Sequence, residues 1–269
     1  MDTAIVDFKG LKIEYHSKDY LGSGSVAKNK EWEPHITGFV KKVKEYLGLK
    51  NIIDIGANFG YHTLLFAREV EGNVYAFEPQ QQNYTLLSNN LKHNDISNII
   101  IYPLACGDVE CDVKMPIFIQ DNSMVNMGDI TPNCTGSTYS VTKSVPLDTM
   151  TFPQIDLIKI DVQGWEKKVL LGSVHLLQKY KPILIIEFEH FQLTKTNTTC
   201  EDLFAYIRAN NYYIFYLEYE YPSDHICVHN DRLGEFTTLF SKYIFPHTED
   251  NTVNHNIKYG VNQRIVIKD

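Results

Sequence analysis

Residues 51–62 read Asn51-Ile-Ile-Asp-Ile-Gly-Ala-Asn-Phe-Gly-Tyr-His62. The β-branched run at 52–55 predicts a short strand buried on both faces, and the glycines that follow predict a tight turn before a helix. Glycine lets the backbone of such a turn approach a ligand closely, and the first N–H groups of a helix can bind an anion. The stretch therefore predicts a strand, turn and helix with a ligand at the turn. A turn of this kind with no ligand is the alternative.

A second strand, Asn73-Val-Tyr-Ala-Phe-Glu-Pro79, supports the ligand interpretation. Its terminal acid, Glu78, lies about 20 residues after the turn, where doubly wound nucleotide-binding folds place the carboxylate for the ribose hydroxyls. A carboxylate suits this role because it can accept two hydrogen bonds from neighbouring hydroxyls. Pro79 has no N–H group and ends the strand. A solvated strand end is the alternative for Glu78.

Composition limits the partners and the compartment. The chain has 269 residues and a net charge of −8, from 25 Lys and Arg against 33 Asp and Glu. This balance argues against a nucleic acid as the main partner, because phosphate recognition usually requires a basic surface. The five cysteines are odd in number and lack C-x-x-C spacing, which argues against a disulfide framework or a metal cluster. We therefore expect a reducing compartment and cytoplasmic localisation.

The N-terminus lacks the pattern of a signal peptide, and the longest apolar run, 182–186, is too short to span a bilayer. We expect one domain over residues 1–269. Residues 1–48 would form an extension, with a hairpin at 4–16 turned at 9–10, a loop at 17–30 and a helix at 32–47. Residues 49–230 would form the ligand-binding core, and residues 231–269 a C-terminal helix and tail that ends in an edge strand.

Within the core, residues 98–104 are expected to form the third strand, and the turn at 105–108 is expected to lie beside an adenine. Residues 108–147 do not fit a simple strand–helix unit. Long irregular segments in compact domains are often functional loops, so residues 121–124 could cover the pocket. A surface excursion is the alternative.

Acidic side chains gather where later strands end. Asp161 follows the apolar strand 157–160, and Lys159 precedes it on the same strand face. Open α/β sheets bind ligands at this edge, so a functional Asp161 is favoured over a helix N-cap. Glu189 shares a face with Glu187 at the end of the next strand, and His190 is a candidate base because its pKa normally lies near neutral pH. An exposed strand-end histidine is the alternative.

Four blocks of sequence resemble the FkbM family of S-adenosylmethionine (SAM)-dependent methyltransferases. They are residues 53–62, residues 74–79, residues 145–148 and the long block 156–172, which is closed by residues 182–187. The resemblance covers roughly residues 50–190. One position departs from the family pattern: the family usually has Lys-x-Asp-Val-Glu-Gly, and here Gln163 replaces the Glu. Glutamine keeps the shape and an acceptor oxygen but loses the charge.

The resemblance implies a class I methyltransferase fold, which is an α/β, Rossmann-like, doubly wound, mostly parallel seven-stranded sheet, here with the N-terminal extension. It implies SAM as cofactor, S-adenosylhomocysteine as product, and a small-molecule or glycan acceptor with a free hydroxyl. We expect O-methylation of a carbohydrate hydroxyl. A divalent cation is conceivable but not expected. The cofactor-binding residues that it implies are Asp54, Gly56, Ala57, Asn58, Gly60, Tyr61, His62, Glu78, Pro79, Ala105 and Asp161. The catalytic residues that it implies are Asp161, Glu189, His190 and Lys159.

Two rival functions stay open at this point. A ribose 2′-O-methyltransferase acting on RNA would recruit Lys159, Asp161 and Glu187 around the hydroxyl, although the acidic composition argues against it. A module that binds SAM without turnover would explain Gln163. N-methylation lacks support because no Asn-Pro-Pro-Tyr motif follows the Asp161 strand. The sequence does not define the acceptor or the oligomeric state.

Overall fold

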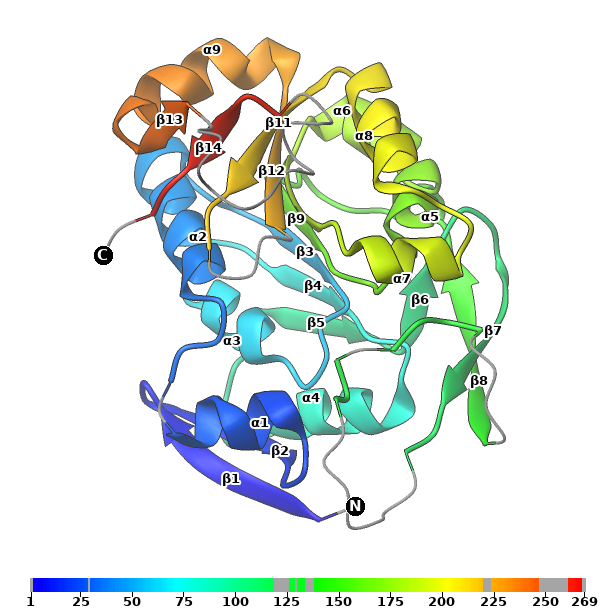
Figure 1. Ribbon diagram of the computed structural model, residues 1–269. Helices are drawn as coiled ribbons and strands as arrows, with labels where there is room; N and C mark the ends of the chain where they lie inside the picture. Colours follow the sequence, from blue (N-terminus) through cyan, green and yellow to red (C-terminus); the bar gives the residue numbers. More distant parts are fainter. Residues whose placement is uncertain are drawn as a thin grey trace.

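A nine-stranded sheet forms the centre of the computed structural model, which describes residues 2–28, 30–118, 126–128, 130–133, 138–219, 224–246 and 261–267 (Figure 1). The strands are β3 (Ile52–Ile55), β4 (Val74–Phe77), β5 (Ile99–Tyr102), β9 (Leu157–Ile160), β10 (Ile183–Glu187), β11 (Tyr212–Leu217), β12 (Asp224–His229), β13 (Ile244–Pro246) and β14 (Gln263–Ile265). Their order in the sheet is β13-β14-β11-β12-β10-β9-β3-β4-β5.

The strand directions confirm the predicted doubly wound, mostly parallel sheet. Strands β5, β4, β3, β9 and β10 run parallel, and β12 runs antiparallel between β10 and β11. These seven strands, from β5 to β11, are the seven expected. The tail strand expected near residue 264 is β14, but it is not the expected edge strand, because it pairs with β11 on one side and with β13 on the other. The chain order reverses between β3 and β9, and ligands bind at such a point.

Helices cover both faces of the sheet because consecutive strand residues point to opposite sides. Ile52 of β3 packs in one apolar core and Ile53 in the other. The first core is covered by α2 (Pro34–Leu47), α3 (Tyr61–Ala67), α4 (Gln81–His93) and α9 (Asn230–Leu239). The second is covered by α5 (Glu166–Leu171), α6 (Val174–Tyr180), α7 (His190–Lys195) and α8 (Cys200–Ala209). Two further 3₁₀ turns are η2 (Leu147–Thr149) and η3 (Ser241–Tyr243).

The N-terminal hairpin has the predicted form. Strand β1 (Thr3–Phe8) pairs with β2 (Leu11–His16), and both turn residues, Lys9 and Gly10, have positive φ. Figure 1 shows the hairpin beside α4, and Asn90 of α4 ties the two together by accepting a hydrogen bond from Glu14 N and donating one to Glu14 O. The extension is therefore attached to the side of the domain that carries α4.

The loop expected at residues 17–30 was wrong, because this segment contains α1 (Tyr20–Gly24) and a 3₁₀ turn, η1 (Val26–Lys28). The buried carboxylate of Asp19 caps α1 by accepting from Gly22 N at 2.9 Å, and it also accepts from Met127 N at 3.0 Å. Helices this short are not stable alone. Contacts from a distant part of the chain thus define a helix that composition does not reveal.

The expected third strand also needs correction. It ends at Tyr102, since Pro103 cannot donate to a strand ladder. Residues 104–106 form β6 (Leu104–Cys106) in a separate three-stranded sheet with β7 (Cys111–Pro116) and β8 (Tyr139–Val145), so Ala105 lies in a strand and not in a turn. Residues 121–124, for which a cover over the pocket and a surface excursion were the two alternatives, lie outside the described residues. No helix in the described part of the chain has the length and apolarity needed to cross a bilayer.

Candidate functional site

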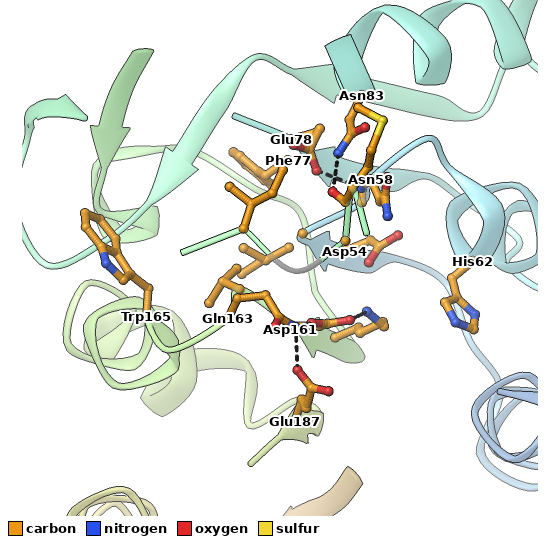
Figure 2. A pocket seen from close by; sticks show the side chains of 18 of the residues that line it. Asp54, Asn58, His62, Phe77, Glu78, Asn83, Asp161, Gln163, Trp165 and Glu187 are labelled. Atoms are coloured by element: carbon orange, nitrogen blue, oxygen red, sulfur yellow. Dashed lines mark hydrogen bonds and ion pairs between the residues drawn. The ribbon is translucent and has the colours of Figure 1, made fainter. Parts of the chain in front are cut away.

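A cavity of about 560 Å³ lies at the edge of the sheet where β3, β4, β9 and β10 end (Figure 2). Residues at these strand ends line it, among them Asp54, Glu78, Asp161 and Glu187. The parallel strands all present their carboxyl ends here, which is the location predicted for a ligand. In Figure 2, Trp165 and His62 lie on opposite sides of the view, with the acidic side chains between them.

The glycine-rich turn after β3 is shaped by close backbone contacts. Gly56 has φ +85°, and a Cβ on it would lie 1.8 Å from the carbonyl oxygen of Asp161. Gly60 has φ +92° and is the N-cap of α3, where a Cβ would lie 2.5 Å from Leu87 Cδ1. Only glycine fits at either place without moving the chain. The turn consequently brings β3 and β9 together at the cavity.

The N–H groups of this turn already have partners inside the protein. Those of Gly56 and Ala57 both donate to Phe77 O at 3.0 Å, and that of Asn58 donates to Glu78 Oε2 at 2.7 Å. Phe59 N donates to Asn58 Oδ1, and Gly60 N donates to Ala57 O. The N–H groups of residues 56–60 are therefore not free to bind a ligand, whereas the first N–H groups of α3, which begins at Tyr61, follow the turn directly.

Glu78 is the acid at the end of β4. Its side chain is buried, and its two oxygens accept from the backbone N–H groups of Asn58, at 2.7 Å, and Gln80, at 2.8 Å. Burial raises the pKa of the Glu78 carboxyl to about 7, although the two N–H donors oppose the rise; nearby Asp54 and Asp161 add to it. Each carboxylate oxygen has a second lone pair, so Glu78 can still accept hydrogen bonds from a ligand.

Asp54 is a buried acid that also lines the cavity. Its Oδ2 accepts from the Thr63 hydroxyl at 2.6 Å, whereas Oδ1 has no partner among the described residues. A buried acceptor with no partner is costly. A ligand donor that reached Oδ1 would therefore be stabilised there.

A row of carboxylates crosses four neighbouring strands at this edge. Asp54 belongs to β3, Asp161 follows β9, Glu187 ends β10 and Asp224 begins β12. The antiparallel direction of β12 brings its first residue to the edge where the parallel strands end, and Asp224 is the register partner of Glu187. Like charges this close need compensation.

The compensation comes from a lysine, a glutamine and a histidine. Lys159 is buried, and its ammonium donates to Asp161 Oδ2 at 3.0 Å. The Gln163 amide nitrogen donates to Asp161 Oδ1 at 2.9 Å and to Glu187 Oε2 at 2.7 Å. His35 Nε2 lies 2.7 Å from Asp224 Oδ2. Each acid of the row from Asp161 to Asp224 therefore has at least one partner.

These contacts set the charge states. Burial alone would raise the pKa of Asp161, but Lys159 and the Gln163 amide outweigh it and hold the pKa below its ordinary value. Burial would lower the pKa of Lys159, but Asp161, Asp54 and Glu33 raise it. Burial and the charges of Asp161 and Asp224 raise the pKa of Glu187 well above its ordinary value. The Lys159–Asp161 pair is therefore ionised, and Glu187 holds a proton more readily.

The outer part of the cavity carries exposed aromatic side chains. Trp32, Tyr20 and Phe191 line it and are 39%, 58% and 64% exposed. Trp32 is fixed by its backbone N–H, which donates to the Tyr61 hydroxyl at 3.0 Å. Next to it, Glu33 pairs with His62 Nε2 at 2.9 Å. The rim thus offers ring faces to a ligand that reaches out of the cavity.

The cavity gathers most of the residues that the sequence singled out. Those that line it are Asp54, Gly56, Ala57, Asn58, Tyr61, His62, Glu78, Pro79, Ala105, Lys159, Asp161 and Glu189. Gly60 is outside the lining and acts through the backbone. His190 is also outside the lining: it is exposed, and its Nδ1 lies 4.0 Å from the sulfur of Cys200. Asp161 does not cap the next helix, which begins at Glu166, whereas Glu189 is the N-cap of α7.

Other lining residues were missed from the sequence. Asp224 could not be identified from the sequence, because it reaches the cavity only through the antiparallel direction of β12. Asn83 of α4 is buried in the lining, donates to Met127 O at 3.0 Å and has an Oδ1 without a partner among the described residues. Among those residues no group of three or more His, Cys, Asp or Glu has the arrangement for a metal ion. The described cysteines, Cys106, Cys111, Cys200 and Cys227, are free.

Glu166 holds the loop of Asp161 and Gln163 in place by accepting two hydrogen bonds from its backbone. Its burial leads to a prediction for the pH dependence of the free energy of unfolding. Its Oε1 accepts from Val162 N and Gly164 N, and burial raises its pKa to about 7. The folded state therefore retains a proton that the unfolded chain loses near pH 4.5, so the free energy of unfolding should fall as pH rises from about 4.5 to 7. We expect Glu166→Gln to reduce this fall by on the order of 3 kcal/mol. Urea unfolding of both proteins at pH 5 and pH 8 measures it, and equal falls would contradict the assignment.

Comparisons with known proteins identify a protein family that matches this chain. A family model described as the methyltransferase FkbM domain matches residues 54–214, which is more than half of the chain. No curated protein sequence matches it. Among solved structures, it is similar to methyltransferase FkbM from Methylobacillus flagellatus, with 19% identity and a TM-score of 0.48. That match covers 66% of this chain and only 43% of the other. It is also similar to an O-methyltransferase from Bacillus cereus in complex with S-adenosylhomocysteine, with 13% identity, a TM-score of 0.45, and coverage of 74% and 82%.

Proposed function

Because this chain belongs to the FkbM methyltransferase family, we propose that it is a SAM-dependent O-methyltransferase that methylates a hydroxyl of a carbohydrate acceptor. The observation that carries the proposal is that a single cavity has acidic side chains in two separate places. Glu78 stands beside the glycine turn, and the row from Asp161 to Asp224 stands beyond it. The first suits the cofactor, and the second suits an acceptor rich in hydroxyls.

The residues of the cavity fit SAM. The Glu78 carboxylate would accept from the ribose hydroxyls, and the unpartnered Asp54 Oδ1 would accept from the amino group of the methionine part. The bound cofactor supplies an electrophilic methyl group on a positively charged sulfur. The remaining proposed contacts are with Gly56, Ala57, Asn58, Tyr61, His62, Pro79, Ala105 and Asp161.

The apolar part of the lining suits the adenine ring. Phe77, Met115, Ile130 and Trp165 contribute to it, together with Ala105 of β6. From the sequence we expected residues 105–108 to lie beside the adenine. We propose that Ala105 contacts the adenine, although it lies in a strand and not in a turn. Aromatic and aliphatic side chains bind a flat base by burial and stacking.

The acceptor hydroxyl would be oriented by the ionised pair. Lys159 is buried and holds one oxygen of Asp161, so the carboxylate cannot rotate freely. Alignment of an oxygen with the methyl carbon removes much of the entropic barrier. An alcohol is a poor nucleophile at neutral pH, so its proton must also be taken. Of the predicted catalytic residues, Asp161, Lys159 and Glu189 line the cavity, whereas His190 does not, and we propose no role for His190.

The charges of the lining favour a neutral sugar over an RNA acceptor. Lys159 is the sole Lys or Arg among the described residues of the lining, and it is already paired with Asp161. The lining acids beyond those of the row and Glu78 are Glu33 and Glu189. Phosphate groups would meet repulsion here, whereas sugar hydroxyls can donate to the same carboxylates.

The exposed rim gives a test of the carbohydrate acceptor. We expect wild-type protein with SAM to methylate a neutral oligosaccharide, and Trp32→Ala to raise the KM for that acceptor about 5-fold, because a ring that stacks on the indole loses about 1 kcal/mol of contact. Transfer from deuterium-labelled SAM is followed by mass spectrometry across a panel of neutral oligosaccharides and deoxy-sugar glycosides. Phe245→Ala is the matched control, since Phe245 is 40% exposed and lies outside the lining.

Either of two outcomes would count against this function. Transfer to a capped RNA but to no sugar would favour the ribose methyltransferase. SAM binding with no transfer to any acceptor of the panel would favour the module without turnover.

A further inference from the structure

We propose that Glu187 takes the proton of the acceptor hydroxyl and that Gln163 is the residue that positions Glu187. The proposal rests on the proposed function and names a group that the sequence did not include among its catalytic residues. Glu187 is the last residue of β10 and lines the cavity. Figure 2 shows its carboxyl group pointing towards Asp161 and Gln163. It thus stands next to the pair that would orient the acceptor.

Asp161 is poorly suited to receive the proton itself. Its Oδ2 accepts from the Lys159 ammonium at 3.0 Å, and its Oδ1 accepts from the Gln163 amide at 2.9 Å. Both contacts stabilise the carboxylate and hold its pKa below the ordinary value. A carboxylate so stabilised is a weak base. The same contacts make it a good fixed acceptor for orienting a hydroxyl.

Gln163 holds the two acids in one arrangement. A single amide nitrogen donates to Asp161 at 2.9 Å and to Glu187 Oε2 at 2.7 Å. The residue has φ +52°, a left-handed conformation that is uncommon outside glycine and is followed here by Gly164 at φ +103°. A glutamate at this position would place a third carboxylate against the other two. The uncharged amide instead supplies a donor where the cluster needs one.

Glu187 faces charged groups from every neighbouring element. Asp161 follows β9, Asp224 begins β12, Glu33 precedes α2, and Lys159 reaches the cluster through Asp161. Burial and the surrounding acids raise the pKa of Glu187 well above its ordinary value. A positively charged cofactor in the cavity opposes that rise, because a nearby cation favours the carboxylate form. The base form is therefore stabilised when the cofactor is bound.

With Glu187 as the base, proton transfer and methyl transfer occur in one step. The acceptor O–H bond breaks and its proton passes to a Glu187 oxygen, while the acceptor oxygen forms a bond to the methyl carbon. The electron pair of the breaking carbon–sulfur bond stays on sulfur, which becomes neutral. Glu187 leaves the step as a carboxylic acid and returns its proton to water once the products have gone.

The test is the pH profile of kcat in Glu187→Gln and Gln163→Glu. We expect wild-type kcat to rise with pH to a plateau, because the base form of Glu187 is needed. In Glu187→Gln, kcat should fall about 100-fold or more and lose this rise, with the Kd of SAM changed less than threefold. Gln163→Glu adds a negative charge beside Glu187, so the rise should move to higher pH by one unit or more. Glu235→Gln, an exposed change on α9, controls for the loss of an acid.

Each contrary result has a separate meaning. If Glu187→Gln keeps the wild-type kcat and pH profile, Glu187 is not the base. If Gln163→Glu keeps the profile, Gln163 does not position it. If wild-type protein binds SAM but methylates no hydroxyl, the proposed function fails and this proposal fails with it. Should Glu187→Gln not fold, Glu187→Asp must show a reduced kcat with its pH rise displaced.

Discussion

Replacing Glu78 with alanine should weaken the binding of SAM about 100-fold. The wild-type carboxylate offers the ribose hydroxyls charge-assisted hydrogen bonds, which are each worth about 1.5–3 kcal/mol. The variant also removes the acceptor of Asn58 N, in the glycine turn, and of Gln80 N, at the start of α4. Isothermal titration calorimetry of SAM against the two proteins measures the difference.

Glu78→Gln is the matched control for this prediction. It keeps the size and one acceptor oxygen but loses the charge, so we expect a loss of affinity between those of wild type and Glu78→Ala. The circular dichroism of all three proteins should be alike, because Glu78 lies at the end of β4 and not within the sheet. A Kd for Glu78→Ala within threefold of wild type would show that Glu78 does not bind the ribose.

The second large effect is expected at the Lys159–Asp161 pair. Asp161→Ala leaves the buried Lys159 ammonium without its main partner, and leaving a buried charge unpaired in this way typically costs about 4 kcal/mol of unfolding free energy. We also expect loss of methyl transfer to below about 1% of wild type, since the acceptor is no longer oriented. Urea unfolding and the labelled-methyl assay measure the two losses.

The double variant Lys159→Met with Asp161→Leu separates stability from function. Replacing both members of a buried ion pair by apolar groups is often neutral for stability. We therefore expect the double variant to regain most of the unfolding free energy that Asp161→Ala loses, and to regain no activity. Equal instability of the single and double variants would show that the pair serves the fold. Activity in the double variant would show that it does not serve the reaction.

Local pattern was sufficient to predict which residues around the glycine turn and Glu78 lie together at the cavity. The run at 52–55, the turn glycines and Glu78 belong to two successive strand–turn units, so their spacing in the sequence fixes their arrangement in space. Lys159 and Asp161 could be predicted in the same way, because both lie at the end of one strand. The hairpin at residues 3–16 followed from alternation around Lys9 and Gly10.

The part of the cavity around Glu187 and Asp224 depends on contacts that no local pattern contains. Asp224 reaches the cavity because β12 inserts antiparallel beside β10, far from it in the chain. The short helix α1 exists because Asp19 also binds Met127. In the sequence Gln163 stood out only for the charge that it lacks, whereas in the fold its amide joins Asp161 to Glu187. His190 looked like a base, but α7 begins there and its ring lies outside the lining.

The claim on which the rest depends is that this cavity binds SAM. Isothermal titration calorimetry of SAM and S-adenosylhomocysteine into wild-type protein tests it most directly. We expect one site per chain with a micromolar Kd for SAM. The absence of any binding heat at millimolar SAM, across the temperatures at which the protein is folded, would contradict the account and leave the fold without its proposed chemistry.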